Sequence, residues 1–284
     1  MRLEGQALQE AEYESDVEQL LPGGVDIGLY TRAHHHRDGL FSTVYKAQAP
    51  ENISMPSVAR RKDRLVAVKV TRPSVMTPPH DSRREGRLLE LAACDNVIPL
   101  LERFTKCGGQ FILSFPFMPF DLGQLLRRGR LSTEQGRSCL RELFTGLAHI
   151  HSVGIIHRDI KPSNILLRSP SGPVFIADFG IAWVEGDPAC EPRDQKILDV
   201  ATTSYRAPEL MFGNQSYDQS LDLWAAGCVV AQVVGLGSQT LFESGDLGSD
   251  LALIKSMFET LGTPTTTTWP VRFQSTQSVS LPVY

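Results

Sequence analysis

Residues 157–164 read His-Arg-Asp-Ile-Lys-Pro-Ser-Asn, and residues 178–180 read Asp-Phe-Gly. Asp159 can accept a hydrogen bond from an attacking hydroxyl group, and Lys161 can meet a transferring phosphate. The side-chain oxygens of Asn164 and Asp178 are ligands of the kind that Mg²⁺ prefers. Phosphoryl transfer depends on positioning and charge neutralisation, so the two motifs, with nineteen positions between their aspartates, predict a phosphoryl-transfer site.

A lysine at the end of a predicted strand supplies the next part of this site. Lys69 ends the run Val66-Ala67-Val68-Lys69. Alone, such a lysine is usually a solvated charge. Glu85 follows sixteen residues later in a predicted helix, where its carboxylate can hold the lysine in place. Lys69 is therefore a candidate phosphate anchor with Glu85 as its partner.

A poorly preserved glycine-rich loop precedes that strand. Residues 37–44 read Arg-Asp-Gly-Leu-Phe-Ser-Thr-Val, in which Gly39 is the only glycine. The backbone N–H groups that cradle phosphate remain. If Arg37 or Ser42 had to adopt a left-handed conformation, the cost would be about 1–2 kcal/mol. We therefore expect a raised KM for the nucleotide.

Composition narrows the class of protein. The chain has 284 residues, 42% apolar residues and a formal charge of -4, which together favour a sizeable core and disfavour nucleic acid as a partner. The longest apolar stretch, 224–236, is too short to cross a membrane, and no secretory signal is expected at the N-terminus. Five scattered cysteines favour a reducing compartment. We expect an intracellular protein of the nucleus, the cytoplasm or both.

Three consecutive histidines, His34 to His36, raise the possibility of a metal site. Side chains of consecutive residues diverge in a strand, and no cysteine or acidic cluster completes a ligand set. A run of histidines in a loop is the favoured interpretation.

The pattern of elements predicts an α+β fold with two lobes. Strands are expected at 43–47, 65–70 and 111–115, and a helix is expected to begin at Asp81 or Ser82. Further helices are expected at 121–126, 133–153 and 221–234. We divide the chain into an acidic mobile segment at 1–24, a small antiparallel β-rich lobe at 25–118 and a mainly helical lobe at 119–284.

The sequence resembles the eukaryotic protein kinase family from about Tyr30 to Pro270. Residues 202–210, Thr-Thr-Ser-Tyr-Arg-Ala-Pro-Glu-Leu, and residues 221–228, Leu-Asp-Leu-Trp-Ala-Ala-Gly-Cys, are similar to motifs of cyclin-dependent and related kinases. The resemblance implies ATP and Mg²⁺ as cofactors, a contact of Thr202 with Asp159 and Lys161, and a serine/threonine kinase activity.

The resemblance also assigns a nucleotide site. Adenine would lie between Val44 and Ala67 above and Leu166 below. Phe115 would be the gatekeeper, the Met118 backbone would contact the adenine edge, and Asp121 would lie near the ribose. The residues assigned to the nucleotide are Gly39, Val44, Ala67, Lys69, Phe115, Met118, Asp121 and Leu166.

Several features depart from the family pattern. Ile197 stands where the family carries its activation-loop phosphothreonine, so Arg158 lacks that partner, and Asp194 or Asp199 is a candidate replacement. Residues 79–85 replace the cyclin-contacting motif, which puts cyclin dependence in doubt. The helical lobe is expected to be truncated, because the family has more helices beyond the position of Tyr284.

Two functions remain open at this point. The first is a serine/threonine kinase in cell-cycle or transcription control, similar to the monomeric fungal kinases that activate cyclin-dependent kinases. Its substrate is a protein, which could be another kinase. The alternative is a catalytically weak or silent scaffold that retains the kinase fold.

Overall fold

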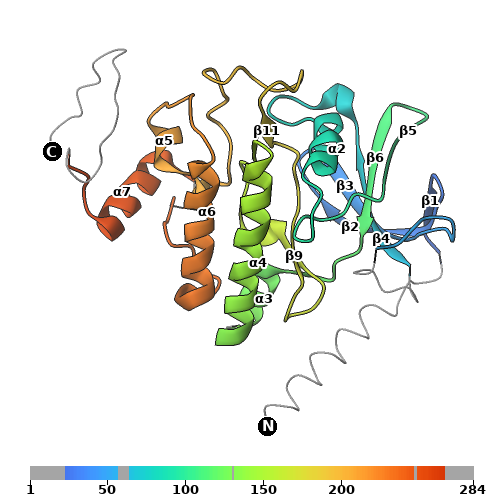
Figure 1. The fold of residues 1–284 in the computed structure, drawn as a ribbon, viewed down its shortest axis with the longest axis horizontal. Coiled ribbons are helices and arrows are strands. Elements are labelled where there is room, and N and C mark those ends of the chain that lie inside the picture. The colour runs from blue at the N-terminus through green and yellow to red at the C-terminus, as the bar shows by residue number, and fades with distance from the viewer. Residues whose placement is uncertain (1–22, 57–63, 130, 246–247, 266–284) are drawn as a thin grey trace, which may run out of the picture. The chain divides into compact units, whose positions relative to one another are not determined.

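The computed structural model describes residues 23–56, 64–129, 131–245 and 248–265 (Figure 1). The chain forms two compact units, residues 1–241 and 242–284, which are described separately. The predicted acidic segment at 1–24 lies outside the described residues except for its last two positions, and the last nineteen residues of the chain, 266–284, also lie outside them. Within the first unit, a β-sheet precedes a helical part (Figure 1). The predicted α+β class with two lobes is confirmed.

A six-stranded sheet forms the first half of this unit. All of its neighbouring strands are antiparallel. The expected strands at 43–47, 65–70 and 111–115 are confirmed as parts of β3, β4 and β6, where β-branched and aromatic residues favour extended backbone. In spatial order the strands are β1 (Val25–Ile27), β2 (Tyr30–Asp38), β3 (Ser42–Gln48), β4 (Leu65–Thr71), β6 (Gln110–Pro116) and β5 (Glu102–Lys106).

The histidine run lies in a strand, so the expected loop is wrong. His34 and His35 pair with residues of β3, and the register is irregular before His34 and between His35 and Arg37. Pairing satisfies the backbone groups that a loop would leave to solvent. The ring of His36 packs edge-on against Phe117 at 5.3 Å. Within the described ranges, no cluster of three or more His, Cys, Asp or Glu side chains could hold a metal ion.

Helix α2 (Ser82–Leu91) packs against this sheet. Asp81 caps it, since its carboxylate accepts a hydrogen bond of 2.8 Å from the Arg84 amide, which confirms one of the two predicted caps. A glycine in a helix costs about 1 kcal/mol. At Gly86 this cost has a reason, because a Cβ there would lie 3.1 Å from Arg103 and 3.3 Å from Leu113. The glycine lets α2 approach strands β5 and β6 closely.

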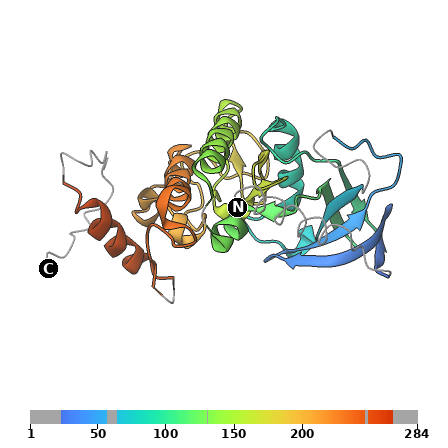
Figure 2. The ribbon, with the colours of Figure 1, turned by 90° about the horizontal axis from the view of Figure 1, so that it is seen from below.

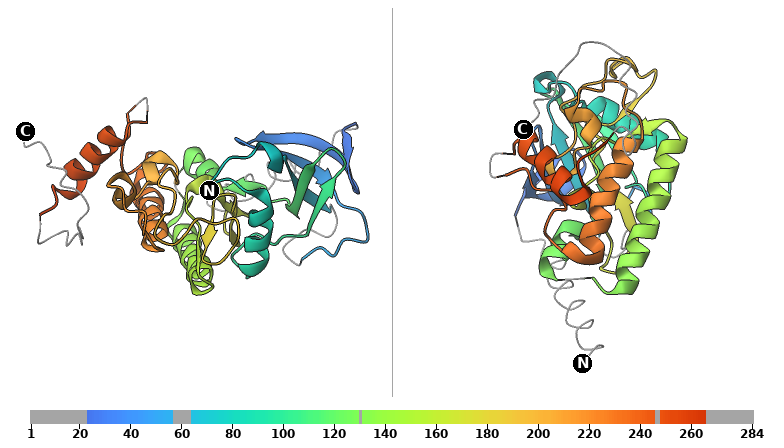
Figure 3. Two further views of the ribbon diagram at one scale, coloured as in Figure 1. Left: turned by 90° about the horizontal axis from the view of Figure 1, so that it is seen from above. Right: turned by 90° about the vertical axis from the view of Figure 1, so that its left-hand side faces the viewer.

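The helical part of the unit begins with α3 and α4. Asp121 and Ser132 cap these helices, each within a reciprocal capping box. The expected helix at 221–234 corresponds to α6, which ends earlier and continues as a π-helical turn. Figures 2 and 3 show α4 and α6 side by side. The helices are α3 (Leu122–Arg128), α4 (Thr133–Ser152), α5 (Pro208–Met211), α6 (Ser220–Ala231) and the π-helix η4 (Gln232–Leu236).

Short strands and turns connect these helices and build the loops between them. One small sheet has the order β10-β9-β7, and another pairs β11 with β8. The strands are β7 (Phe120–Asp121), β8 (Ile155–Ile156), β9 (Ile165–Leu167), β10 (Val174–Ile176) and β11 (Trp183–Val184). The 3-10 helices are η1 (Pro73–Val75), η2 (Pro162–Asn164) and η3 (Thr203–Tyr205). These short pieces place the sequence motifs on loops between larger elements.

The second unit contains helix α7 (Asp250–Leu261), which is capped by Ser249. No helix among the described residues is long and apolar enough to cross a membrane. All five cysteines are free. Burial raises the pKa of Cys139 and of Cys228 to about 12, so both thiols stay protonated at neutral pH.

The packing of α4 generates a test with a matched control. A Cβ added at Gly146 would lie 2.9 Å from Ile176 and 3.0 Å from Asn96, whereas a Cβ at Gly227 in α6 would meet nothing within 4 Å. We expect Gly146→Ala to lower the free energy of unfolding by about 1–3 kcal/mol. Gly227→Ala is expected to leave it unchanged or raise it by up to about 1 kcal/mol. Urea unfolding of both variants measures the difference, and equal stabilities would contradict the packing.

Candidate active site

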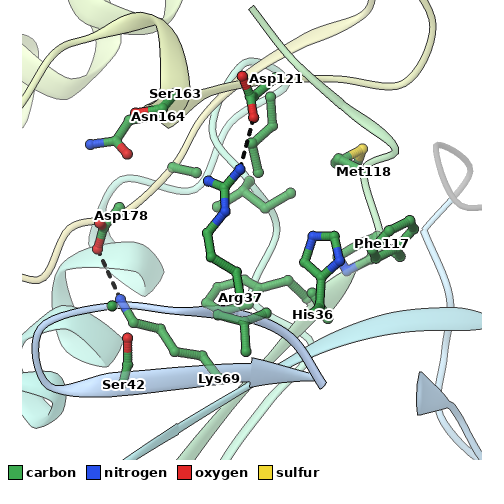
Figure 4. Close-up of a pocket in the computed structure, with 18 of the residues that line it drawn as sticks. His36, Arg37, Ser42, Lys69, Phe117, Met118, Asp121, Ser163, Asn164 and Asp178 are labelled. Carbon is green, nitrogen blue, oxygen red and sulfur yellow. Dashed lines mark hydrogen bonds and ion pairs between the residues drawn. The ribbon is translucent and has the colours of Figure 1, made fainter. Parts of the chain in front are cut away.

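A cavity of about 200 Å³ lies between the six-stranded sheet and the helical part (Figure 4). The β2–β3 hairpin and β4 border it on one side, and the turn after β6 closes one end. Residues assigned from sequence to the nucleotide and to Mg²⁺ come from many parts of the chain, yet all of them line this one cavity. They are Gly39, Val44, Ala67, Lys69, Phe115, Met118, Asp121, Asn164, Leu166 and Asp178.

Lys69 joins two carboxylates at the inner end of the cavity. Its Nζ donates to both oxygens of Glu85 at 2.7 and 2.9 Å and to Oδ1 of Asp178 at 2.8 Å. Figure 4 shows the contact with Asp178. Glu85 is 1% exposed, whereas Asp178 is half exposed. Burial acts to lower the pKa of Lys69, but the two carboxylates outweigh burial and raise it. The ammonium group therefore stays charged.

The pKa values of Asp178 and Glu85 shift in opposite directions. The Lys69 ammonium lowers the pKa of Asp178 well below the usual range of an aspartate, so Asp178 stays ionised and suited to a cation. Burial raises the pKa of Glu85, although Lys69 opposes that effect. The charge of Glu85 thus depends on its contact with Lys69.

Asp159 is held by three side chains, among them Asn164, which lines the cavity. Thr202 donates to its Oδ1 at 2.8 Å, and Lys161 lies 2.8 Å from its Oδ2. Asn164 donates to its Oδ2 at 3.0 Å, and Lys161 also donates to the hydroxyl of Thr202 at 2.7 Å. The contacts of Thr202 that the family resemblance implied are present. A carboxylate held from both sides can orient a hydroxyl group for attack.

Asp222 of α6 stabilises the loop that carries Asp159 by accepting hydrogen bonds from its backbone. The carboxylate of Asp222 accepts hydrogen bonds from the amides of His157 and Arg158 at 2.8 and 2.9 Å and lies 2.9 Å from Nε2 of His151. Asp222 is fully buried. Its motif was noted in the sequence, but no pattern there indicated that it supports the catalytic loop.

Three residues other than glycine, in or near the same loop, have a left-handed backbone conformation. Arg158, Asp178 and Ala201 have φ values of 68°, 67° and 65°. For residues other than glycine, such values cost about 1–3 kcal/mol each and persist only where the surroundings enforce them. The hydrogen bonds of Asp222 to the Arg158 amide and of Lys69 to the Asp178 carboxylate hold two of these residues in place. Arg32 and Arg64, in or beside the six-stranded sheet, also have positive φ values.

Arg158 has a partner that the sequence did not indicate. Its Nη1 lies 3.2 Å from Oε1 of Glu191 and 3.0 Å from the hydroxyl of Tyr217. The expectation that Asp194 or Asp199 fills this role is wrong. Arg158 is completely buried, and the side chain of Glu191 is mostly buried, at 14% exposed. Asp199 is 91% exposed and pairs with Arg206, and Asp194 is also exposed.

Helix α2 is tied to the segment after Asp-Phe-Gly by two arginines. Arg87 donates to both oxygens of Asp187 at 2.8 Å, in a bidentate ion pair. Arg84 is buried and donates to the carbonyl oxygen of Ala189 at 2.8 Å. Asp187 lies one hundred residues after Arg87, so sequence reasoning missed this pair and no local signal could have revealed it. Since Glu85 lies between the two arginines, both contacts help to orient it.

The glycine-poor loop closes without the expected strain. Arg37 pairs with Val44 at the end of the β2–β3 ladder, and neither Arg37 nor Ser42 has a positive φ. The amide of Gly39 donates to the carbonyl oxygen of Ser42 at 2.7 Å, which forms the turn. The condition for the predicted cost of a left-handed residue is therefore not met.

The donor set of this site fits Mg²⁺. Asn164 uses its amide nitrogen for its hydrogen bonds to Asp159, which leaves the amide oxygen for a cation. Asp178 contributes an ionised, half-exposed carboxylate. Protein sites for Mg²⁺ commonly supply one or two such oxygens and leave the remaining positions to phosphate and water. Asn164 and Asp178 match that pattern.

Comparison with known proteins agrees with this geometry. Residues 38–280 match the protein kinase domain. Cyclin-dependent kinase 7 of Xenopus laevis is 33% identical over 89% of this chain and 69% of its own length. The serine/threonine-protein kinase csk1 of Schizosaccharomyces pombe is 31% identical over 84% of this chain and 75% of its own length.

The match to a third relative covers a smaller share of that relative's length. Cyclin-dependent kinase 20 of Homo sapiens is 36% identical over 68% of this chain, and the match spans about half of that relative, 54% of its length. The kinase domain accounts for most of the present chain. The chain therefore belongs to the protein kinase family, as an ATP- and Mg²⁺-dependent serine/threonine kinase of the cyclin-dependent-kinase type.

Proposed function

We propose that this protein phosphorylates serine or threonine hydroxyl groups of a protein substrate, with Asp159 as the residue that orients the attacking hydroxyl. One observation carries the proposal. The Lys69–Glu85–Asp178 contacts and the Asp159–Lys161–Thr202 contacts are both formed within the same chain, and Asn164, which lines the cavity with Lys69 and Asp178, bonds Asp159. Positioning of this kind supplies most of the catalysis in phosphoryl transfer.

Each side chain then has a role that follows from its contacts. Asp159 accepts the hydrogen bond of the substrate hydroxyl, and Lys161, 2.8 Å from Asp159, neutralises charge beside it. Lys69 grips the phosphate tail of the nucleotide from its position against Glu85. Asn164 and Asp178 would hold Mg²⁺, which would neutralise negative charge on the phosphates when bound.

The apolar part of the cavity accounts for base binding. Val44 and Ala67 come from adjacent strands β3 and β4, and Leu166 lies in β9 of the helical part. Adenine between these side chains, with Phe115 behind it and the Met118 backbone at its edge, would be held mainly by apolar contact. Asp121 borders the same cavity at the position assigned to the ribose.

The activation segment is proposed to work without an added phosphate group. Ile197 has no hydroxyl group to phosphorylate, and Arg158 already contacts the carboxylate of Glu191. Like a phosphate, a carboxylate can accept charge-assisted hydrogen bonds from a guanidinium group. Glu191 therefore takes the place of the missing phosphothreonine as a permanent partner.

The finer biological role is also part of the proposal. The resemblance to the monomeric fungal kinases that activate cyclin-dependent kinases supports a protein substrate that could be another kinase. The replaced motif at 79–85 and the Lys69–Glu85 contact within this chain support doubt about dependence on a cyclin. We place its action inside the cell, in the nucleus or cytoplasm, in cell-cycle or transcription control. No nucleic-acid or membrane partner is proposed. The proposed division is an N-lobe at 25–118 and a C-lobe at 119–284.

Loss of Asp159 tests the activity. We expect Asp159→Asn to reduce transfer of labelled γ-phosphate from ATP to a serine/threonine peptide library by about 10²- to 10⁴-fold. Asp194→Asn is the matched control, because Asp194 is exposed and lies outside the site, and it should leave transfer unchanged. If the wild-type protein binds ATP and Mg²⁺ in a thermal-shift assay but transfers no more phosphate than Asp159→Asn, the silent-scaffold alternative holds instead.

Removal of the charge on Glu191 tests the phosphate-independent segment. Arg158 has no exposed surface, so Glu191→Gln should leave a buried charge poorly paired and lower the free energy of unfolding by about 1–3 kcal/mol. The turnover number should fall about tenfold or more while the KM for ATP stays unchanged. Glu185→Gln is the control, since Glu185 meets Arg193 only at 3.9 Å with both side chains exposed. Equal effects of the two substitutions would contradict the role of Glu191.

The Arg87–Asp187 pair predicts a dependence of stability on pH. The hydrogen bond from Arg87 lowers the pKa of Asp187 below its value in the unfolded chain, about 3.9. The pair therefore stabilises the fold fully above about pH 4, and this contribution is lost as the pH falls through the folded-state pKa. In urea unfolding, Asp187→Asn should be less stable than the wild-type protein at neutral pH, and the difference should shrink below about pH 4. A difference that stays constant or grows in acid would sink this assignment.

A further inference from the structure

An arginine lies across the mouth of the cavity, where the kinase pattern carries a glycine. The guanidinium group of Arg37 extends from the end of β2 to Asp121, and its Nη2 lies 3.0 Å from Oδ2 (Figure 4). Asp121 is 4% exposed, whereas Arg37 is 49% exposed. A partly exposed cation thus covers a buried carboxylate.

Both oxygens of Asp121 are engaged. Oδ1 accepts a hydrogen bond of 2.8 Å from the amide of Gln124 and caps helix α3, and Oδ2 accepts from Arg37. A hydrogen bond between a guanidinium group and a carboxylate is stronger than one from a neutral hydroxyl. A ribose hydroxyl that reaches Asp121 therefore meets an acceptor that a stronger donor already occupies.

The hairpin that carries Arg37 is closed over the cavity at a second point. The ring of Phe41, at the tip of the hairpin, packs against His80 at 4.9 Å between ring centres. The cavity measures about 200 Å³, while sites that enclose a small-molecule ligand usually measure about 300–1,000 Å³. A nucleotide must therefore move groups at the mouth of the cavity, and the Arg37 side chain, which is 49% exposed, is one that has room to move.

We propose that Arg37 is a specificity-determining residue of the nucleotide site, which competes with the ribose hydroxyls for Asp121. The inference rests on the proposed function in one respect, the position of Asp121 beside the ribose. Its consequence is that the protein binds ATP less tightly than its base and phosphate contacts permit. It also distinguishes ATP poorly from the 2′-deoxy and 3′-deoxy nucleotides.

The test is a comparison of dissociation constants measured by calorimetry on the full chain with Mg²⁺ and ATP, 2′-deoxyATP or 3′-deoxyATP. In Arg37→Ala we expect ATP to bind about two- to fivefold tighter, the range set by a partly exposed ion pair. The affinity for the deoxy analogue that lacks the hydroxyl at Asp121 should increase less. The ratio of the affinity for ATP to the affinity for that analogue should therefore rise.

A second substitution changes Asp121, the acceptor for which Arg37 and the ribose hydroxyls compete. Asparagine is as good a helix N-cap as aspartate, so Asp121→Asn keeps the start of α3 while it removes the charge that holds Arg37. In the Asp121→Asn background, Arg37→Ala should change neither the affinity for ATP nor the ratio. Arg37→Lys in the wild-type background keeps a cation beside Asp121 and should behave like the wild-type protein.

The outcomes separate this inference from the function on which it rests. If wild-type protein binds ATP, and Arg37→Ala binds it equally or more weakly with an unchanged ratio, Arg37 does not compete for Asp121 and the inference is overturned. If neither the wild-type protein nor Arg37→Ala binds any of the three nucleotides, the proposed function fails and this inference fails with it. Tighter binding with a raised ratio, lost in Asp121→Asn, supports both.

Discussion

The ammonium group of Lys69 is the contact on which the arrangement of this protein depends. It bonds Glu85 of α2 at 2.7 Å and Asp178 of the segment after β10 at 2.8 Å, and it is itself part of β4. A buried carboxylate such as Glu85 is costly without a partner, so α2 is stable in this orientation only while Lys69 meets it. One charge thus fixes the orientation of a helix, a strand and a loop together.

Permanent charges also hold the segments that many proteins control by modification. Asp222 binds the backbone of the catalytic loop, and Glu191 pairs with Arg158. The bidentate contact of Arg87 with Asp187 couples α2 to the same segment. A carboxylate cannot be removed by a phosphatase, so these contacts favour a site that is assembled whenever the chain is folded.

The mouth of the nucleotide cavity is formed by a paired hairpin and by one long side chain, Arg37. The β2–β3 hairpin keeps its shape through strand pairing, and Arg37 pairs with Val44 just after a register irregularity between His35 and Arg37. Because Arg37 has no positive φ, its backbone needs no glycine there, which frees the position for a long side chain that reaches Asp121. The loss of glycines therefore changed what lies across the cavity and left the turn itself unstrained.

Local features of this protein were determined by the sequence alone, because short-range geometry controls them. The strands around Val68 and Leu113 follow from β-branched and apolar runs, and the caps at Asp81 and Ser132 follow from a side chain three residues before its amide partner. The spacing of the catalytic motifs likewise required only neighbouring residues.

Only the tertiary structure decided which acid meets Arg158. Glu191, Asp194 and Asp199 are alike in charge and close in sequence, and burial alone distinguishes the first from the other two. The same holds for Arg87 with Asp187, which lie 100 residues apart in sequence, and for Arg37 with Asp121, which lie 84 residues apart. Such pairs form because distant elements fold together, and no local pattern in the chain encodes the distance between them.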